Sequence, residues 1–377
     1  MPDLTREEIL RYSRQLMIPG VGLEGQKKLK AASVLVVGMG GLGSPVALYL
    51  AAAGVSRLGL VDDDCVDMSN LQRQVIHSMA SVGRSKAQSA AERIRGLNPD
   101  VQVEVYEERF TSENAERISA GYDILVDGTD NFPTRYLLND LAVLTGKPYV
   151  YGSVYRFEGQ VSVFDARTGP CYRCLFPEPP PPGIIPTCSE GGVFGVLPGT
   201  IGTLQVTEVI KLILGIGEGL AGRLLLYDAL DATMQTVTLK KNPRCKVCGP
   251  EPEVTRMIDY EAFCGLTPQA PDPEHEISPR ELAERLRSGR IQLVDVRDPV
   301  EQQISALPGA LNAPWDRVEL ALADMDRDAD LVLFCRSGDR SARAVKRLLR
   351  AGFKSVRSLR GGLNAWAEEV DPEMRKY

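Results

Sequence analysis

A glycine-rich turn between an apolar strand and an alanine-rich helix constrains the fold of this chain more than any other feature. The β-branched run Ser33–Val37 ends in Gly38-Met39-Gly40-Gly41-Leu42-Gly43, and Ser44–Ala53 then has the composition of a helix. A second apolar run, Arg57–Val61, ends at Asp62. Strand, helix and strand in this order form a βαβ unit, which predicts a parallel sheet with helices on its faces.

Further apolar segments extend this pattern along the chain. We expect strands at Val101–Tyr106, Ile124–Val126 and Gln160–Phe164, because each is a short apolar run that ends near polar residues or glycine. The proline-dense stretch Pro177–Pro186 can be neither helix nor central strand, whereas Thr203–Leu214 has the composition of an apolar helix. The first domain is therefore predicted to be a Rossmann-like, doubly wound α/β fold.

A change in composition marks a second domain. Five prolines between Pro250 and Pro273, with few apolar runs, indicate a linker over 251–276. This predicts one domain over 1–250 and a smaller α/β domain over 277–377. The elements expected in the smaller domain are helices at Pro279–Arg287 and Ser341–Ala351 and strands at Ile291–Val296 and Leu331–Phe334.

Composition excludes several classes of function. The chain has 377 residues and a net charge of -6, so it offers no basic surface for nucleic acid. Met1–Gln15 carries charges throughout, and no later stretch is apolar for long enough to span a bilayer. We therefore expect a cytoplasmic protein without a membrane partner. In a reducing compartment the eight cysteines indicate metal binding or thiol chemistry rather than disulfides.

The glycine turn is of the kind that binds a phosphate-bearing cofactor. Glycines let backbone N–H groups and a helix N-terminus approach phosphates, and Asp62 stands where an acidic residue can bind ribose hydroxyls. A tight turn without a ligand is the alternative interpretation. Downstream, Arg73 and Lys86 could neutralise a triphosphate, and Asp130 could hold Mg²⁺. These charges favour ATP over NAD, unless they are solvated surface side chains.

Five segments resemble the MoeB/ThiF family, relatives of the ubiquitin-activating enzymes, from about residue 5 to residue 250. They are Arg11-Tyr12-Ser13-Arg14-Gln15, Gly38–Gly43, Ser69–Gln74, Asp127–Asn131 and Pro170-Cys171-Tyr172-Arg173-Cys174. The resemblance implies an ATP·Mg²⁺ site, and a homodimer in which Arg14 reaches the site of the other subunit. The implied ATP site comprises Gly41, Asp62, Ser69, Asn70, Leu71, Gln72, Arg73, Lys86, Asp130 and Asn131.

Two pairs of cysteines have the spacing of a structural metal site. Cys171-x₂-Cys174 and Cys245-x₂-Cys248 are knuckles of the kind that close a tetrahedral Cys₄ zinc site. Four thiolates leave no open coordination position, so we expect a structural rather than a catalytic zinc. Four unconnected free thiols are the alternative.

Cys188 follows the proline-rich stretch, in the sequence Pro186-Thr187-Cys188-Ser189-Glu190-Gly191-Gly192. This region resembles the crossover loop of relatives, whose cysteine can take an acyl group as a thioester. The resemblance thus implies a catalytic role for Cys188. A buried or idle cysteine is the alternative, since some family members complete their reaction at the adenylate.

The second domain carries a loop suited to sulfur chemistry, Cys335-Arg336-Ser337-Gly338-Asp339-Arg340-Ser341, after a predicted strand. Loop N–H groups, a helix N-terminus and two arginines would stabilise a thiolate or a persulfide at Cys335. The loop resembles that of rhodanese-like sulfurtransferases, and it is one residue shorter than related phosphatase loops. Ala306 departs from the resemblance, because many relatives carry histidine before the Pro308-Gly309-Ala310 turn. An inactive, structural module is the alternative.

Together these features predict an adenylyltransferase fused to a sulfurtransferase. The resemblance implies that the C-terminal Gly-Gly of a small ubiquitin-like sulfur carrier attacks ATP, and that a Cys335 persulfide converts the acyl-adenylate into a thiocarboxylate. Thiosulfate or a cysteine desulfurase would supply the sulfur, and in relatives such products feed molybdopterin, thiamine, cysteine or tRNA-thiolation pathways. An NAD-dependent oxidoreductase with an accessory domain and a binding scaffold are the alternative functions.

Overall fold

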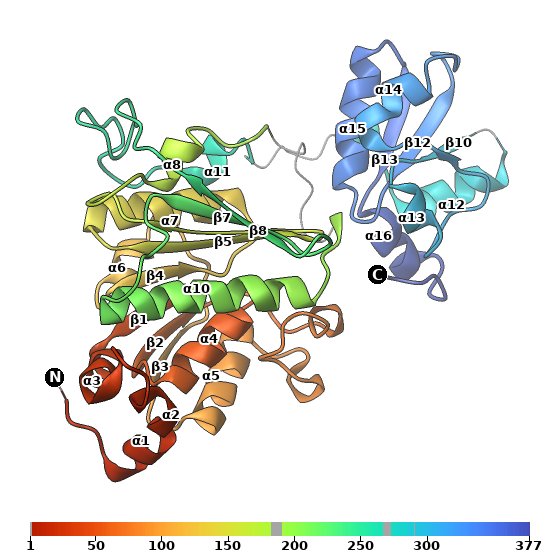
Figure 1. The fold of residues 1–377 in the computed structure, drawn as a ribbon. Helices are drawn as coiled ribbons and strands as arrows, with labels where there is room; N and C mark the ends of the chain where they lie inside the picture. Colours follow the sequence, from red (N-terminus) through yellow and green to blue (C-terminus); the bar gives the residue numbers. More distant parts are fainter. Residues whose placement is uncertain (1, 182–190, 267–272, 290) are drawn as a thin grey trace. The chain divides into compact units, whose positions relative to one another are not determined.

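The computed structural model describes residues 2–181, 191–266, 273–289 and 291–377 (Figure 1). The chain divides into two compact units, Met1–Thr267 and Pro268–Tyr377. Each unit has hydrophobic cores of its own, so each can be understood from its own sheet and helices.

An eight-stranded sheet forms the centre of the first unit, in the order β3-β2-β1-β4-β5-β6-β7-β8 (Figure 1). Neighbouring strands from β3 to β5 are parallel, whereas those from β5 to β8 are antiparallel. The parallel part confirms the α/β class and the βαβ unit predicted from the glycine turn. The strands are β1 (Ser33–Val37), β2 (Arg57–Val61), β3 (Gln102–Tyr106), β4 (Ile124–Asp127), β5 (Tyr149–Tyr155), β6 (Glu158–Phe164), β7 (Arg223–Asp228) and β8 (Thr233–Thr238).

The central strand β1 shows why an unbroken apolar run forms this sheet. Val34 and Val36 lie in the core on one face, and Leu35 and Val37 lie in the core on the other. Side chains alternate between the two faces of a strand, so a strand covered on both faces is apolar at every position.

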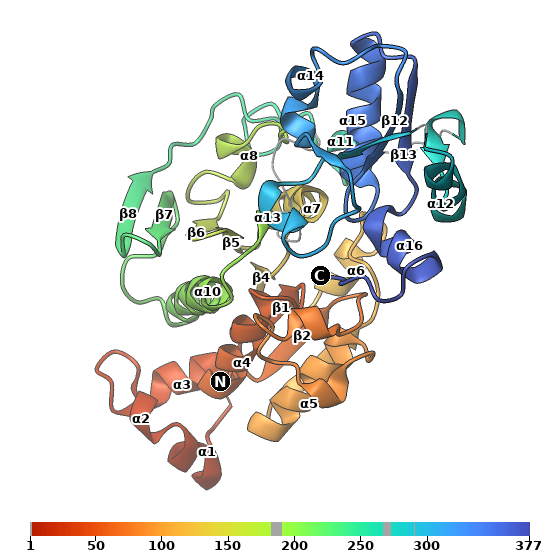
Figure 2. The same ribbon diagram turned by 90° about the vertical axis from the view of Figure 1, so that its right-hand side faces the viewer.

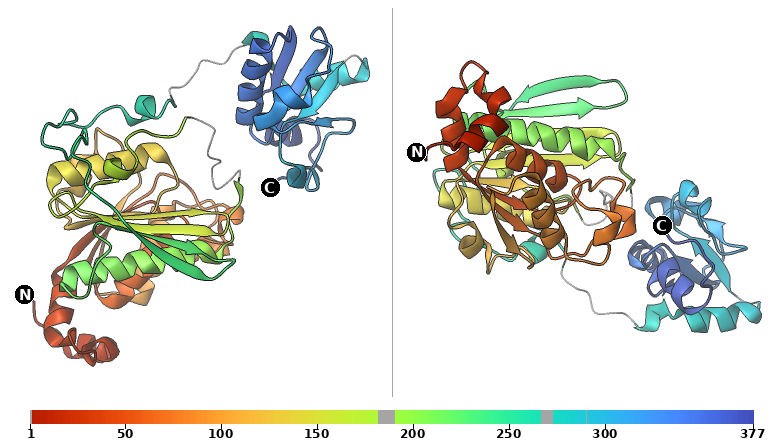
Figure 3. Two further views of the ribbon diagram at one scale, coloured as in Figure 1. Left: turned by 45° about the horizontal axis from the view of Figure 1, so that its top comes forward. Right: turned by 90° about the horizontal axis from the view of Figure 1, so that it is seen from below.

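Helices cover both faces of the sheet. α4 (Gly43–Ala53), α5 (Lys86–Leu97) and α10 (Val196–Leu214) pack on one face, where Figure 2 shows α4 and α10 next to one another. α6 (Ala115–Ser119) and α7 (Phe132–Thr145) pack on the other face. The N-terminal helices lie at one end of the unit (Figure 3): α1 (Arg6–Arg11), α2 (Ser13–Leu16) and α3 (Gly22–Ala31).

Helix α10 differs from the prediction in two ways. It begins at Val196 rather than at Thr203, because Pro198 falls in the first turn, where a helix tolerates proline. It is also long and apolar enough to cross a membrane by length and composition alone, contrary to the sequence prediction. Ile201 and Val209 are nevertheless buried in the core against the sheet, as in the core helix of a globular domain.

The segment predicted as a linker, residues 251–276, is partly packed. Its helix α11 (Tyr260–Phe263) contacts α7, where the Tyr260 hydroxyl donates to Asp140 Oδ2 at 3.0 Å. Cys264 is buried in the same core. The first unit therefore extends to Thr267 rather than to residue 250, because Tyr260 and Cys264 complete the apolar layer over α7.

The second unit is built on a five-stranded parallel sheet in the order β11-β10-β12-β13-β9, with a hydrophobic core on each face. The helix predicted at Pro279–Arg287 is α12, and Ser278 caps its N-terminus. The remaining strands and α-helices are β9 (Glu276–Ile277), β10 (Gln292–Asp295), α13 (Pro299–Gln302), β11 (Leu311–Asn312), α14 (Val318–Ala321), β12 (Asp330–Phe334), α15 (Asp339–Arg350), β13 (Ser355–Leu359) and α16 (Gly362–Glu369). Two 3-10 helices, η3 (Pro273–His275) and η4 (Trp315–Arg317), complete the part of this unit that the structure describes.

Candidate active sites and metal centre

The glycine turn after β1 holds Asp62 against its backbone. The Met39 N–H donates to Asp62 Oδ2 at 2.7 Å. A side chain at Gly43 would collide with the carbonyl oxygen of Gly38, so α4 begins directly against the turn. Burial raises the pKa of Asp62, and the nearby Lys86 charge opposes that shift. Asp62 is thereby fixed at the end of β2, where an acidic residue can meet a ribose.

His77 supports the same turn from inside the unit. Its Nε2 lies 3.0 Å from the Met39 carbonyl oxygen, and its Nδ1 lies 2.9 Å from Ser89 Oγ. Burial lowers the pKa of His77, so the ring is neutral at pH 7 and Nε2 donates to the carbonyl. A buried imidazole with both nitrogens bonded is a structural support rather than a general base.

The two cations predicted at the triphosphate have partners within the first unit. Lys86 is buried, and its Nζ lies 2.7 Å from Asp64 Oδ2. Arg73 donates from Nη1 to the Ser69 carbonyl oxygen at 3.0 Å. The Asp64 side chain is 69% exposed, so it can turn into solvent and leave the Lys86 ammonium to a phosphate.

The segment 69–74 and the start of α10 come together over the glycine turn. A side chain at Gly41 would lie 3.0 Å from Pro198 Cβ and 3.6 Å from Arg73 Cγ. The lack of a side chain at Gly41 therefore lets Pro198 and Arg73 approach the turn closely. Gln72 lies against Gly195 in the same region, so the predicted segment and α10 approach the turn together.

The short turn that leads to Arg73 is formed by Ser69, Asn70 and Leu71. Met68–Asn70 is a 3-10 helix capped by Asp67, whose Oδ1 accepts a hydrogen bond from the Ser69 N–H at 2.8 Å, and Leu71 ends it. These residues therefore shape the segment through their backbone.

Gln74 was absent from the predicted site set. It is buried near Gly40, and its Oε1 has no hydrogen-bond partner among the residues that the structure describes. A buried, unpaired amide atom is unusual, and its place beside the glycine turn adds Gln74 to the candidate ATP site. Its position in the motif Ser69–Gln74 was the only signal in the sequence.

The loop after β4 reaches the glycine turn as well. The backbone of Gly128 lies against Gly38. The buried Asp127 fixes this loop, because its Oδ1 accepts a hydrogen bond from the Thr129 N–H at 2.8 Å. Beyond it the Asp130 side chain is exposed. An exposed carboxylate on a fixed loop beside a phosphate-binding turn has the chemistry of a Mg²⁺ ligand.

Three other predicted residues have different surroundings. Asn131 caps α7, where its Oδ1 accepts a hydrogen bond from the Thr134 N–H at 3.0 Å. Arg14 is exposed on α2. Cys188 lies outside the described residues. Asn131 therefore has a local structural role, and the roles expected of Arg14 and Cys188 stay predictions.

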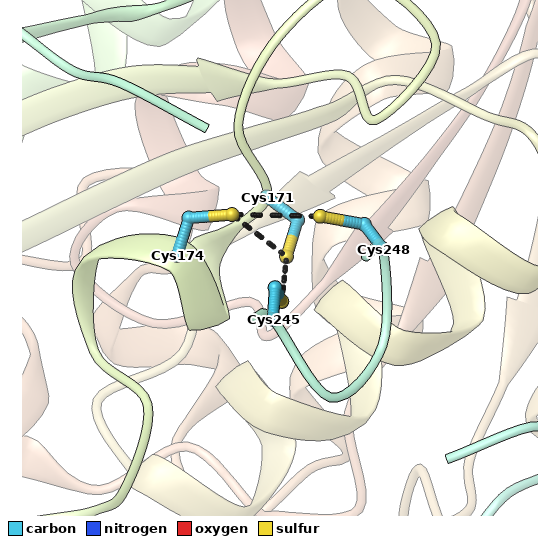
Figure 4. A group of neighbouring side chains, drawn as sticks. All are labelled: Cys171, Cys174, Cys245 and Cys248. Atoms are coloured by element: carbon cyan, nitrogen blue, oxygen red, sulfur yellow. Dashed lines mark hydrogen bonds between the residues drawn. The ribbon is translucent and has the colours of Figure 1, made fainter. Parts of the chain in front are cut away.

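Four cysteines from two segments meet at one point of the first unit (Figure 4). The sulfur atoms of Cys171, Cys174, Cys245 and Cys248 all lie within 4.8 Å of one another. The Cys171–Cys245 and Cys174–Cys248 sulfur distances are 3.5 and 3.4 Å. A tetrahedron with metal–sulfur bonds of about 2.3 Å has edges of about 3.8 Å. The cluster therefore has the size and donor set of a Cys₄ metal site.

A buried ion pair holds the first knuckle to α7. Arg173 lies between Cys171 and Cys174 on α8 (Tyr172–Leu175), and it donates to both carboxylate oxygens of Asp140 at 2.8 and 2.7 Å. Tyr260 donates to the same carboxylate. Because both charged side chains are buried, this geometry fixes the knuckle firmly to the core.

In the second unit, Cys335 lies at the carboxyl end of β12 with its sulfur facing loop donors. The Gly338 N–H donates to Cys335 Sγ at 3.1 Å, and the Ser341 hydroxyl lies 3.7 Å away. Gly338 has a φ of +100°, a conformation that favours glycine, and it is also the N-cap of α15. One N–H and one hydroxyl therefore face the sulfur at the N-terminus of α15, an arrangement of donors that suits a transferable sulfur.

The two arginines of this loop have different surroundings. Arg340 is buried and donates to both carboxylate oxygens of Glu301, at 2.6 and 2.7 Å. Arg336 is half-buried, and its guanidinium carbon lies 5.2 Å from the ring centre of Tyr377. Both arginines were predicted to have the same role at Cys335. Glu301 and Tyr377 were not predicted, because neither lies near Cys335 in the chain.

The other loop residues are on the surface. Ser337 and Asp339 are exposed, and the Ser337 hydroxyl donates to Asp339 Oδ2 at 2.7 Å. They shape the loop at the solvent side, whereas Gly338 and Arg340 fix it from within.

Comparisons with known proteins agree with this arrangement. The sequence profile of the ThiF family matches residues 12–247, and that of the rhodanese-like domain matches residues 278–369. The chain is 51% identical to the probable adenylyltransferase/sulfurtransferase MoeZ of Mycobacterium tuberculosis, over 99% of this chain and 96% of that protein. It is 58% identical to the sulfur carrier protein adenylyltransferase of Thermus thermophilus, over 70% of this chain and 98% of that protein.

One further relative and one solved structure extend the comparison. The adenylyltransferase and sulfurtransferase MOCS3 of Mus musculus is 44% identical, over 99% of this chain and 88% of that protein. A crystal structure of E. coli MccB has a TM-score of 0.58 at 22% identity, over 63% of this chain and 74% of that chain. The latter likeness concerns the fold.

A glycine-turn α/β unit with a Cys₄ cluster, followed by a unit with a cysteine loop, defines a two-domain transferase. The chain belongs to the ThiF family and carries a C-terminal rhodanese-like domain. It is an adenylyltransferase and a sulfurtransferase. The NAD-dependent oxidoreductase that the glycine turn left open is not favoured.

Proposed function

We propose that this enzyme activates the C-terminal Gly-Gly of a small ubiquitin-like sulfur carrier with ATP and converts it into a thiocarboxylate. The observation that carries the proposal is the joint presence of a turn that holds Asp62 and a thiol bonded to the N–H of Gly338. The first suits a nucleotide and the second a transferable sulfur. The name of the Thermus thermophilus relative supports the carrier as substrate.

In the first step, a carboxylate oxygen of the carrier attacks the α-phosphorus of ATP, and the bond to pyrophosphate breaks. Asp62 would bind the ribose hydroxyls, while Arg73 and Lys86 would offset the charge of the phosphates. Asp130 would hold Mg²⁺, which neutralises charge on the phosphate oxygens when bound. Positioning and charge stabilisation supply this chemistry, so the neutral His77 need not act as a base.

Zinc is the proposed occupant of the Cys₄ cluster, with a structural role. Its four thiolates fill a tetrahedral shell and leave no position for substrate. We also propose a homodimer, in which the exposed Arg14 of one subunit contacts ATP in the other. The cytoplasm remains the predicted compartment.

In the second step, a persulfide on Cys335, loaded from thiosulfate or a cysteine desulfurase, attacks the carbonyl carbon of the acyl-adenylate and AMP leaves. The product is an acyl disulfide between the carrier and Cys335. A thiol reductant then attacks the Cys335 sulfur, and the thiocarboxylate leaves. A further thiol reduces the resulting disulfide between Cys335 and the first thiol, which restores Cys335. Alternatively, Cys188 first takes the acyl group as a thioester, and the persulfide attacks that thioester.

Mass spectrometry of candidate carriers tests the proposal. The carrier is incubated with the enzyme, ATP, Mg²⁺, thiosulfate and a thiol reductant, and the expected product has one C-terminal oxygen replaced by sulfur. Omitting ATP should leave the carrier unchanged, because the carbonyl is then not activated. If every candidate carrier stays unmodified although the enzyme consumes ATP, the proposed product is contradicted.

A further inference from the structure

The side chain of Tyr377 touches the sulfurtransferase site through both its hydroxyl and its ring. The hydroxyl donates to Glu301 Oε1 at 2.6 Å and accepts a hydrogen bond from Arg297 Nη1 at 2.8 Å. The ring centre lies 5.2 Å from the guanidinium carbon of Arg336, the residue after Cys335. One tyrosine thus contacts the loop arginine and the carboxylate that the other loop arginine binds.

The hydroxyl joins two buried ion pairs. Arg297 donates to both oxygens of Asp295, at 2.9 and 2.6 Å, and Arg340 donates to both oxygens of Glu301. All four charged side chains are buried. Tyr377 lies between the pairs, and burial raises its pKa to about 12, so the hydroxyl keeps its proton at neutral pH.

The two loop arginines differ in their accessibility to a substrate. Arg340 would have to break two hydrogen bonds to a buried carboxylate before it could reach a substrate, which is costly. Arg336 is half-buried and lies next to the nucleophile in the chain. Arg336 is therefore the more accessible of the two loop arginines, and the aromatic ring of Tyr377 is one of its contacts.

We infer that Tyr377 is a positioning residue of the sulfurtransferase site, whose ring orients Arg336 toward the anionic donor and whose hydroxyl fixes the Glu301–Arg340 pair behind the loop. This inference rests on the proposed use of Cys335 with a thiosulfate-type donor. It predicts that ring and hydroxyl contribute to different quantities: the ring to the KM for the donor, and the hydroxyl to the stability of the second unit.

The test uses the full chain, four test variants and one control variant. Tyr377→Ala removes ring and hydroxyl, Tyr377→Phe removes the hydroxyl alone, and Arg336→Ala removes the cation, singly and together with Tyr377→Ala. Lys376→Ala is the matched control, because Lys376 is the exposed neighbour and pairs with Glu368 rather than with the loop. The readouts are kcat and KM for thiosulfate with cyanide as sulfur acceptor.

Tyr377→Ala should raise the KM for thiosulfate by about three- to tenfold with a smaller change in kcat, in the range of a cation–π contact. Tyr377→Phe and Lys376→Ala should keep the wild-type KM. In the Arg336→Ala background, Tyr377→Ala should have no further effect on KM, because its target is gone. A wild-type KM in Tyr377→Ala, or equal effects in both backgrounds, would overturn the inference.

A binding assay separates this inference from the proposed donor. Sulfate has the charge and shape of thiosulfate but lacks its outer, transferable sulfur atom. Bound sulfate should therefore protect Cys335 from alkylation by iodoacetamide. Mass spectrometry of the peptide that contains Cys335 measures the alkylated fraction. Tyr377→Ala should raise the sulfate concentration for half-protection, and Tyr377→Phe should not. If the wild type turns over no thiosulfate, the proposed donor fails, and this protection series still decides the role of Tyr377.

Discussion

Arg340 and Glu301 form a buried pair joined by two parallel hydrogen bonds, 39 residues apart in the chain. Burial opposes the charge of Glu301, but the hydrogen bonds from Arg340 and Tyr377 outweigh it and hold the pKa of Glu301 below its ordinary value of 4.5. A carboxylate whose pKa is lower in the folded state contributes stability above its unfolded pKa. That contribution is lost as the pH falls through the folded value.

The second unit should therefore lose stability on acidification below about pH 4.5 through this pair. Trp315 and Trp366 are the two tryptophans of the chain and both belong to the second unit, so their fluorescence follows its unfolding in urea. Glu301→Gln should lower its stability at pH 7 by about 3 kcal/mol, because the buried Arg340 loses the negative charge of Glu301. The variant should also show a flatter acid dependence. If the free energy of unfolding falls with pH equally steeply in Glu301→Gln and in the wild type, this pair does not make the proposed contribution.

Asp130→Asn should lower carrier-dependent ATP–pyrophosphate exchange by at least about 100-fold, because a ligand for Mg²⁺ at the phosphates is removed. Asp100→Asn is the matched control, since Asp100 is an exposed aspartate before β3, at the other end of the strands. The control should keep wild-type exchange. Wild-type exchange in Asp130→Asn would remove this residue from the site.

The purified protein should contain about one zinc ion per chain. Cys171→Ser and Cys245→Ser should lose the metal and lower the melting temperature of the first unit, because metal binding is coupled to folding. Cys65→Ser, which changes an exposed cysteine away from the cluster, should keep both. Elemental analysis and a thermal melt measure the two effects. A metal-free protein that melts as high as the metal-bound one would count against a structural metal.

Cys335→Ala should abolish thiosulfate sulfurtransferase activity and leave ATP–pyrophosphate exchange within about twofold of wild type, because nucleophile and ATP site belong to separate compact units. Carrier thiocarboxylate should then fail to form with thiosulfate as donor. Wild-type thiocarboxylate yield in this variant would exclude a persulfide on Cys335.

Cys188→Ala distinguishes the two routes to the thiocarboxylate. A thioester route predicts that the adenylate forms but the thiocarboxylate does not, whereas direct attack by the persulfide predicts nearly full yield. We expect a loss of thiocarboxylate, and the carrier mass after single turnover measures it. Full yield would exclude the thioester and leave the persulfide step intact.

The sequence was sufficient where local pattern and tertiary packing agree. β1 was predicted at its full length, because burial on both faces makes every residue of Ser33–Val37 apolar or small. The antiparallel strand β8 was not predicted, since all six of its residues, Thr233–Thr238, are exposed and show no apolar alternation. Its place in the sheet comes from pairing with β7.

The same distinction between local pattern and tertiary packing applies to the residues of the functional sites. The Cys335 loop and the cysteine knuckles are contiguous motifs, so their residue types and spacing carry the information. Glu301 and Tyr377 act through partners 39 and 76 residues away, and nothing in their own neighbourhoods indicates this. The buried amide of Gln74 and the Lys86–Asp64 pair likewise become visible only once the connection between β2 and α5 is folded, with Gln74 near Gly40 of the glycine turn.

Because the four thiols of the Cys₄ cluster lie close together, dioxygen can oxidise them to disulfides when no metal is bound. Once a chelator removes the ion, Cys171 and Cys245, and likewise Cys174 and Cys248, are pairs of thiols whose sulfurs lie within 3.5 Å. A two-electron oxidant such as dioxygen can then join each pair as a disulfide after a small movement. Such a protein would no longer bind the proposed zinc until it is reduced, so chelators call for anaerobic handling or excess thiol during purification.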